Sequence, residues 1–211
     1  MIRNSYSLNV NMDTKSGKAV RRRACVAVLV FLLALALSAC GGSDGADNPD
    51  SRLSEEEATA TLEGAPAPLA TIRSEANQLL DGGADAFERR LEELRGFPVV
   101  VNDWASWCGP CRYEFPFFQS QAVKHAKEIA FLGVDSDDSA AAAERFLGEL
   151  PLPYPSFSDD DLAIRRSIGA VGYPATAFYD RTGELVYTHQ GQYRTEEDLV
   201  ADLDRYALGA G

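Results

Sequence analysis

The sequence is poor in positive charge, in histidine and in cysteine, and these shortages narrow what the protein can be. It has 20 Lys and Arg against 32 Asp and Glu, and six of the basic residues lie in residues 1–39. The rest of the chain therefore has 14 basic and 31 acidic residues, a balance that repels nucleic acid phosphates and offers no polybasic surface to anionic lipid. We therefore exclude nucleic acid as a partner.

The four cysteines fall into two groups. Cys25 and Cys40 lie near the N-terminus, whereas Cys108 and Cys111 are the only cysteines in the remaining chain. Two cysteines cannot build a scaffold of several disulfides, so this pair indicates either a redox centre or half of a metal site. A purely structural disulfide is a further alternative, although so short a loop gains little chain entropy.

A metal site is not expected. Structural zinc needs four ligands, and no other thiol is in range of the Cys108/Cys111 pair. His125 and His189 are the only imidazoles, and we expect each to be an exposed residue of a helix or strand.

The N-terminal segment has the pattern of a secretory signal. Arg21-Arg22-Arg23 precedes an apolar run over residues 24–37, which ends in small residues. Leu37-Ser38-Ala39-Cys40 resembles the bacterial lipobox, in which the cysteine is acylated and becomes the first mature residue. We predict a lipoprotein signal peptide over residues 1–39, starting at Met1 or Met12, and lipidation at Cys40. The alternative is an uncleaved transmembrane anchor, and both place the body outside the cytoplasm on a membrane tether.

Small, acidic and proline residues dominate residues 40–68. Such a composition has too little to bury to offset the entropy of ordering, so we predict a flexible acidic tether over 40–68. Residues 69–211 are then the folded domain.

Helical and strand patterns alternate through this domain. Helical spacing or capping signals predict helices over 84–94, 112–126, 139–150, 159–168 and from Thr195 onward. Apolar runs predict buried strands over 99–101 and 129–134, and turn residues at 180–183 predict a hairpin of 175–179 with 184–188. This order indicates an α/β fold whose central sheet has parallel neighbours and a late antiparallel edge.

Two cysteines separated by Gly109 and Pro110 suit a dithiol reagent. If a helix begins at this loop, its free N–H groups and dipole stabilise a thiolate at Cys108, and Cys111 lies one turn later, partly buried and within bridging reach. Pro110 is tolerated there because first-turn amides have no helical partner. A strand leading into the loop would place it at a carboxyl edge of the sheet, where α/β ligand sites gather.

The residues around the dithiol resemble a known family. Residues 101–112 read VNDWASWCGPCR, which resembles the active-site segment of the thioredoxin superfamily. Glu114-Phe115-Pro116 resembles the TlpA/ResA/DsbE branch, whose members are extracytoplasmic and membrane-tethered. The likeness runs from about Gly96 to the last helix, and it implies a thioredoxin-like fold with a central mixed sheet flanked by helices.

The resemblance also implies roles for single residues. Cys108 matches the nucleophile and Cys111 the resolving cysteine, and their redox-active disulfide is the only cofactor we expect. Pro174 matches the cis-proline beside the active site; the alternative is a trans proline that opens a strand. Tyr173 and Trp107 would line the substrate groove, and Tyr173 is bulkier than expected there.

Glu114 matches a carboxylate that this branch keeps near the dithiol. It follows Cys111 by three residues and so lies on the same side of a helix. Partly desolvated, it would have a raised pKa and would move the proton of Cys111; the alternative is an ordinary surface glutamate. Asn102 stands where thioredoxin has a buried aspartate, so that proton acceptor is missing.

These features predict thiol–disulfide exchange on exported proteins by a monomer. The leading hypothesis is a reductant, for example for apocytochrome c thiols, supplied with electrons by a membrane partner. One alternative is an oxidase for the folding of secreted proteins. The other is a tethered binding module without turnover.

Overall fold

The computed structural model describes residues 64–209. The predicted signal peptide, Cys40 and most of the predicted tether lie outside these residues. The described elements are α2 (Ala67–Ser74), β1 (Leu79–Leu80), α3 (Gly83–Glu93), β2 (Val99–Trp104), α4 (Gly109–Lys124), β3 (Ala130–Ser136), α5 (Ala140–Glu149), β4 (Ser156–Asp159), α6 (Ala163–Ser167), β5 (Ala175–Tyr179), β6 (Leu185–Gln190), α7 (Glu196–Asp202) and the π-helical turn η1 (Leu203–Ala207).

The sheet is mixed and has the order β1-β4-β3-β2-β5-β6. β1, β4, β3 and β2 run parallel, and β5 and β6 add an antiparallel edge. Every residue of β2 and β3 is buried, as their continuous apolar runs predicted. The expected α/β fold, with parallel central strands and a late hairpin, is confirmed.

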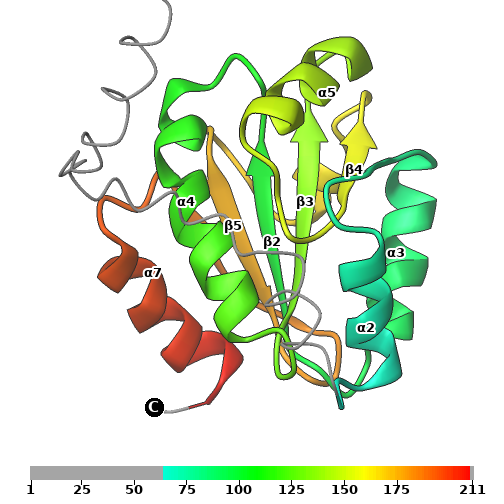
Figure 1. Cartoon of the computed structure of the whole chain (residues 1–211), viewed down its shortest axis with the longest axis vertical. Helices are drawn as coiled ribbons and strands as arrows, with labels where there is room; N and C mark the ends of the chain where they lie inside the picture. Colours follow the sequence, from blue (N-terminus) through cyan, green and yellow to red (C-terminus); the bar gives the residue numbers. More distant parts are fainter. Residues whose placement is uncertain (1–63, 210–211) are drawn as a thin grey trace, which may run out of the picture. The chain divides into compact units, whose positions relative to one another are not determined.

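Helices cover the central strands. In Figure 1, α4 lies on the near side of the sheet next to β5, and α7 lies beside α4. α3 and α6 contact each other and also pack against β4. The loop from β2 to α4 lies at the carboxyl end of the parallel strands, which is the top of the domain in Figure 1.

Three elements of the sheet and its cover escaped the sequence prediction. α2 begins at Ala67, two residues before the predicted domain boundary, and β1 has only two residues. β4 reads Ser-Phe-Ser-Asp, which carries little strand signal of its own. It is a strand because its backbone pairs on both edges, with β3 and with β1. These partners lie elsewhere in the chain, so the sequence of β4 itself does not indicate the strand.

Close approach of β3 and β4 requires a residue without a side chain at Gly133. A Cβ there would overlap Ser156 Oγ and lie 2.9 Å from Trp104 Nε1, two atoms joined by a 3.1 Å hydrogen bond in the core. Gly133→Ala is therefore expected to lower the free energy of unfolding by about 1–3 kcal/mol, the usual cost of overpacking. Denaturant unfolding of the oxidised protein measures this.

Gly148→Ala is the matched control. Gly148 lies exposed in α5, and a Cβ added there would meet nothing within 4 Å, so alanine should stabilise the helix by about 0.5–1 kcal/mol. Equal effects of the two substitutions would contradict the packing described for Gly133.

Candidate active site

Cys108 and Cys111 form a disulfide where β2 passes into α4. Cys108 is the N-cap of this 16-residue helix, and its Sγ accepts a hydrogen bond of 3.1 Å from the backbone N–H of Cys111. Pro110 occupies the first turn, as predicted. The helix terminus therefore directs a backbone donor and its positive dipole end at the Cys108 sulfur, which favours a thiolate there after reduction.

The two cysteines are less accessible than expected. Cys108 is 4% exposed and Cys111 is fully buried, so Cys108 is the more accessible of the two. Trp107, the residue before Cys108, is 58% exposed, whereas Trp104 is fully buried against Phe115 and Phe146. Trp104 therefore packs in the core, while Trp107 remains available at the surface.

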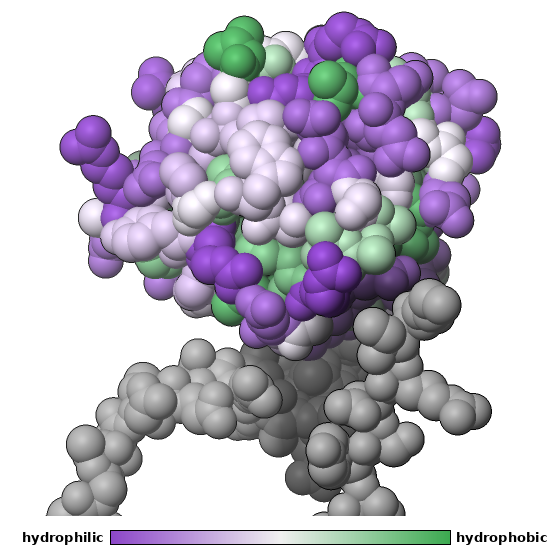
Figure 2. All heavy atoms as spheres, turned by 90° about the horizontal axis from the view of Figure 1, so that it is seen from above, coloured by the Kyte–Doolittle hydropathy of each residue, from purple (hydrophilic) through white to green (hydrophobic). Residues whose placement is uncertain are grey.

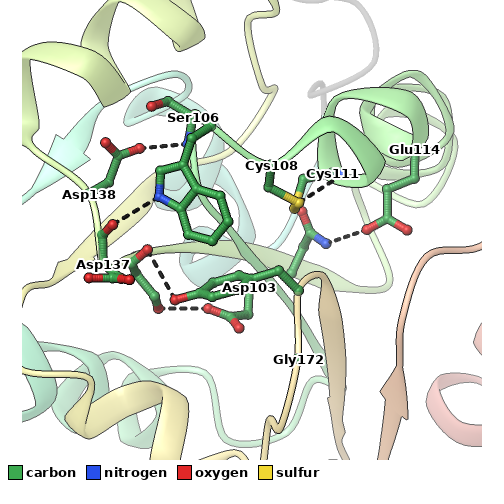
Figure 3. The surroundings of a disulfide bond; sticks show 12 residues. Asp103, Ser106, Cys108, Cys111, Glu114, Asp137, Asp138 and Gly172 are labelled. Carbon is green, nitrogen blue, oxygen red and sulfur yellow. Dashed lines mark hydrogen bonds between the residues drawn. A yellow bond between two sulfur atoms is a disulfide. The ribbon is translucent and has the colours of Figure 1, made fainter.

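Glu114 is fully buried, so the alternative of an ordinary surface glutamate is wrong. One of its carboxylate oxygens accepts a hydrogen bond of 2.9 Å from Asn102 Nδ2, and the other accepts one of 2.8 Å from the backbone N–H of Tyr193. Burial raises the pKa of Glu114 to about 8, although both hydrogen bonds oppose the rise. Figure 3 shows Glu114 further along the helix that begins at Cys108.

Asn102 connects this carboxylate to the centre of the sheet. It lies on β2, is 1% exposed, and pairs in register with Gly133 and Thr176 of the flanking strands. No described residue donates a hydrogen bond to its Oδ1. The sequence predicted that the acceptor of thioredoxin is missing at this position; the fold brings the carboxylate of Glu114 against it from α4 instead.

The bond between Tyr173 and Pro174 is cis, as predicted. Pro174 is buried, and Tyr173 is half-buried with its ring 4.9 Å from the ring of Trp107. The segment before β5 is thereby placed beside the residue that precedes Cys108. Val171, in the same segment, is 84% exposed.

The surface around the disulfide combines apolar and acidic residues. Figure 2 looks down on this end of the domain and shows pale and apolar residues interrupted by strongly hydrophilic ones. Asp137 accepts a hydrogen bond of 3.0 Å at its backbone oxygen from Trp107 Nε1, and the Asp138 carboxylate accepts one of 2.5 Å from the backbone N–H of Ser106 (Figure 3). The loop after β3 thus holds the residues that precede Cys108.

Three buried charged residues near this site were missed in the sequence. Asp103 is fully buried, and burial raises its pKa to about 7. Asp135 is 4% exposed, and burial followed by the charge of Asp138 raises its pKa to about 8. Arg165 pairs with Asp103. The one signal in the sequence was Asp103 itself, an aspartate that lies two residues after the apolar run of a predicted buried strand. A buried aspartate requires a partner, but the sequence alone does not identify which residue that is.

The two histidines are half-buried instead of exposed. His125 is the C-cap of α4, and His189 stacks on Tyr193 with 4.1 Å between ring centroids. Within residues 64–209, no three His, Cys, Asp or Glu side chains are grouped so as to hold a metal ion. In the same range, no helix has the length and apolar character needed to cross a bilayer.

Comparisons with known proteins agree with this geometry. A family model described as Redoxin matches residues 62–204. The chain is 26% identical over 116 residues to the thiol-disulfide oxidoreductase ResA of Bacillus thuringiensis subsp. konkukian (strain 97-27), which covers 54% of this chain and 66% of the relative. It is 37% identical over 94 residues to the thiol:disulfide interchange protein DsbE of Pseudomonas fluorescens biotype C, which covers 44% of this chain and 51% of the relative.

A solved structure, that of a DsbE-type thiol:disulfide interchange protein from Chlorobium tepidum, matches with a TM-score of 0.52 at 30% identity. The match covers 55% of this chain and 84% of that one. The chain thus spans less than two thirds of the length of the two curated relatives. The predicted thioredoxin-like fold is confirmed.

Proposed function

The chain belongs to the Redoxin family, and from that premise we propose that it exchanges thiols and disulfides with exported proteins through Cys108 and Cys111. The observation that carries the proposal is the position of Cys108 as N-cap of α4, bonded to a fully buried Cys111. A helix terminus beneath one sulfur and a partner within one turn satisfy both needs of a dithiol reagent.

The exchange proceeds in two displacements. The Cys108 thiolate attacks one sulfur of a client disulfide and forms a mixed disulfide, and the other client sulfur leaves as a thiolate that takes a proton. The Cys111 thiolate then attacks the Cys108 sulfur and releases the second client thiolate. Two electrons pass to the client, which becomes a dithiol, while the protein becomes the Cys108–Cys111 disulfide.

Glu114 is the proposed proton carrier for Cys111. Its raised pKa of about 8 makes its carboxylate a stronger base, which accepts the proton that Cys111 loses as it becomes a nucleophile. The same group would protonate the Cys111 sulfur when a donor reduces the disulfide. Tyr173 and Pro174 would bind the client segment, since backbone beside the dithiol can pair with an extended chain.

Reduction is the favoured direction. The Gly-Pro spacer is that of thioredoxin, whose couple lies at about −270 mV. Each turnover as a reductant gives two electrons to the client. A membrane partner that carries a dithiol would replace them and restore the reduced form. Apocytochrome c, with its cysteine thiols, is one class of client. Lipidation at Cys40 would hold the domain on the outer side of a membrane.

Reduction of insulin by the full chain tests the proposal. Wild type should accelerate the reduction of insulin disulfides by dithiothreitol, and Cys108→Ser should not. Cys25→Ser makes the same chemical change outside the described residues and should behave as wild type. Equal rates for wild type and Cys108→Ser would leave only a binding module. Equilibration with glutathione decides the direction, since a potential well above about −200 mV would favour oxidation.

A further inference from the structure

Arg165 joins the core of the domain to the segment that precedes β5. Its side chain, on the short helix α6, is only 10% exposed. Nη1 donates to the carboxylate of Asp103 on β2, and Nη2 donates to the backbone oxygen of Gly172 over 2.7 Å. The guanidinium carbon also lies 3.6 Å from the centre of the Tyr173 ring.

Tyr173 is held from three sides. Arg165 covers its ring, its hydroxyl donates to the backbone oxygen of Ser136 over 3.2 Å, and Trp107 packs edge-on against it. Figure 3 shows Gly172 and Asp103 on the same side of the Cys108 loop. The residues before Cys108 and those before Pro174 are therefore connected through contacts among Arg165, Tyr173 and Trp107.

Asp103 is equally fixed. It is fully buried, and its second carboxylate oxygen accepts a hydrogen bond of 2.6 Å from Ser136 Oγ. Asp159 fixes the backbone of Arg165, because its carboxylate accepts hydrogen bonds from the backbone N–H groups of Ile164 and Arg165. The start of α6 is thus tied to the end of β4.

A buried ion pair contributes little to stability by comparison with apolar residues of equal volume, so stability alone does not account for this pair. A guanidinium is planar and has several N–H donors, so it can pair with a carboxylate, donate to a carbonyl oxygen and stack on an aromatic ring at the same time. Here the carbonyl and the aromatic face both belong to the segment beside the dithiol.

We propose that Arg165, anchored by Asp103, is a positioning residue that holds the backbone of Gly172 and the ring of Tyr173 in the orientation that binds an extended, cysteine-bearing segment of a client protein. This inference rests on the proposed exchange activity and adds the group that shapes its client site. Arg165 acts on binding through Tyr173 and Gly172, and it takes no part in the sulfur chemistry.

Two disulfides of different size separate binding from chemistry. Insulin chains can lie along the Gly172–Pro174 backbone, whereas hydroxyethyl disulfide reaches Cys108 without that support. The test variant is Asp103→Leu/Arg165→Met, because replacing both partners by apolar residues avoids leaving one buried charge unpaired. Arg166→Met, the exposed neighbour on α6, is the matched control.

The double variant should raise the KM for insulin by about tenfold with kcat within about twofold, the pattern of lost ground-state binding. Its rate with hydroxyethyl disulfide should equal that of wild type. Arg165→Lys should also show a raised insulin KM, since an ammonium keeps the charge but cannot serve the ion pair, the Gly172 oxygen and the Tyr173 ring together. Arg166→Met should match wild type with both disulfides.

A double variant with an unchanged insulin KM would overturn the inference, and so would an equal slowing with both disulfides. If wild type itself fails to react with hydroxyethyl disulfide, the proposed exchange activity fails and the inference fails with it. These results are distinguishable because the small disulfide reports on the dithiol alone.

Discussion

A full chain carrying Cys111→Ser is expected to accumulate a covalent adduct with its client while turnover falls by about three orders of magnitude or more. Cys108 keeps its place at the start of α4, so its thiolate still attacks a client disulfide. The buried sulfur that would resolve the mixed disulfide is absent, and serine cannot displace a thiolate. The attack therefore stops after its first step.

Mass spectrometry of the reaction under non-reducing conditions measures the adduct. One client chain should be attached per protein molecule, and dithiothreitol should release it. Cys108→Ser is the control and should trap no client at Cys111, because that remaining cysteine of the pair is fully buried. Trapping by both variants alike would mean that the helix terminus does not select one sulfur.

Glu114→Gln is expected to slow release of the client by about 100-fold near pH 7 and to remove a transition near pH 8 from the pH profile. The reason is that Glu114 carries a proton with a pKa of about 8 in the folded protein, whereas glutamine keeps the shape and cannot titrate. Stopped-flow kinetics of mixed-disulfide resolution between about pH 5 and pH 10 measures both effects. Glu144→Gln on the exposed side of α5 is the control.

The same substitution should change how stability depends on pH. The pKa of Glu114 is raised from 4.5 to about 8 by folding, so the stability it contributes is fully present below 4.5 and is lost as the pH rises towards 8. The free energy of unfolding should fall on the order of 1.4 kcal/mol per pH unit from this group. Glu114→Gln should flatten that part of the curve.

Asp103 and Asp135 add to the same trend, since burial raises their pKa values to about 7 and 8. The pH dependence left in Glu114→Gln should therefore have the same sign as in wild type. A variant whose stability curve matched wild type from pH 4.5 to about 8 would contradict a buried, protonated Glu114.

The elements that the sequence predicted well are those with local signals. The apolar run of β2, the turn between β5 and β6 and the capping of α7 by Thr195 each depend on neighbouring residues. The sequence predicted a helix over 159–168, whereas α6 spans Ala163–Ser167. The carboxylate of Asp159 does accept two N–H groups of α6, although the residue itself ends β4.

The elements and contacts that escaped depend on partners distant in sequence. β4 is a strand because β3 and β1 lie on either side of it. Asp103 is tolerated in β2 because Arg165, 62 residues later in the sequence, donates a hydrogen bond to its carboxylate. Burial of Glu114 was likewise not decided by its helical position, because the residues that enclose it include Asn102 and Tyr193 from elsewhere in the chain.

By itself, the sequence determined the chemical identity of the site: two cysteines with two residues between them, a proline suited to a helix start, and a second proline in the segment that precedes β5. These are local properties, since spacing and backbone preference act between neighbours. Only the tertiary structure decided the electrostatics, because a pKa of about 8 for Glu114 and an ion pair beneath Tyr173 arise from burial. Burial is a property of the packed chain and is not carried by any one segment.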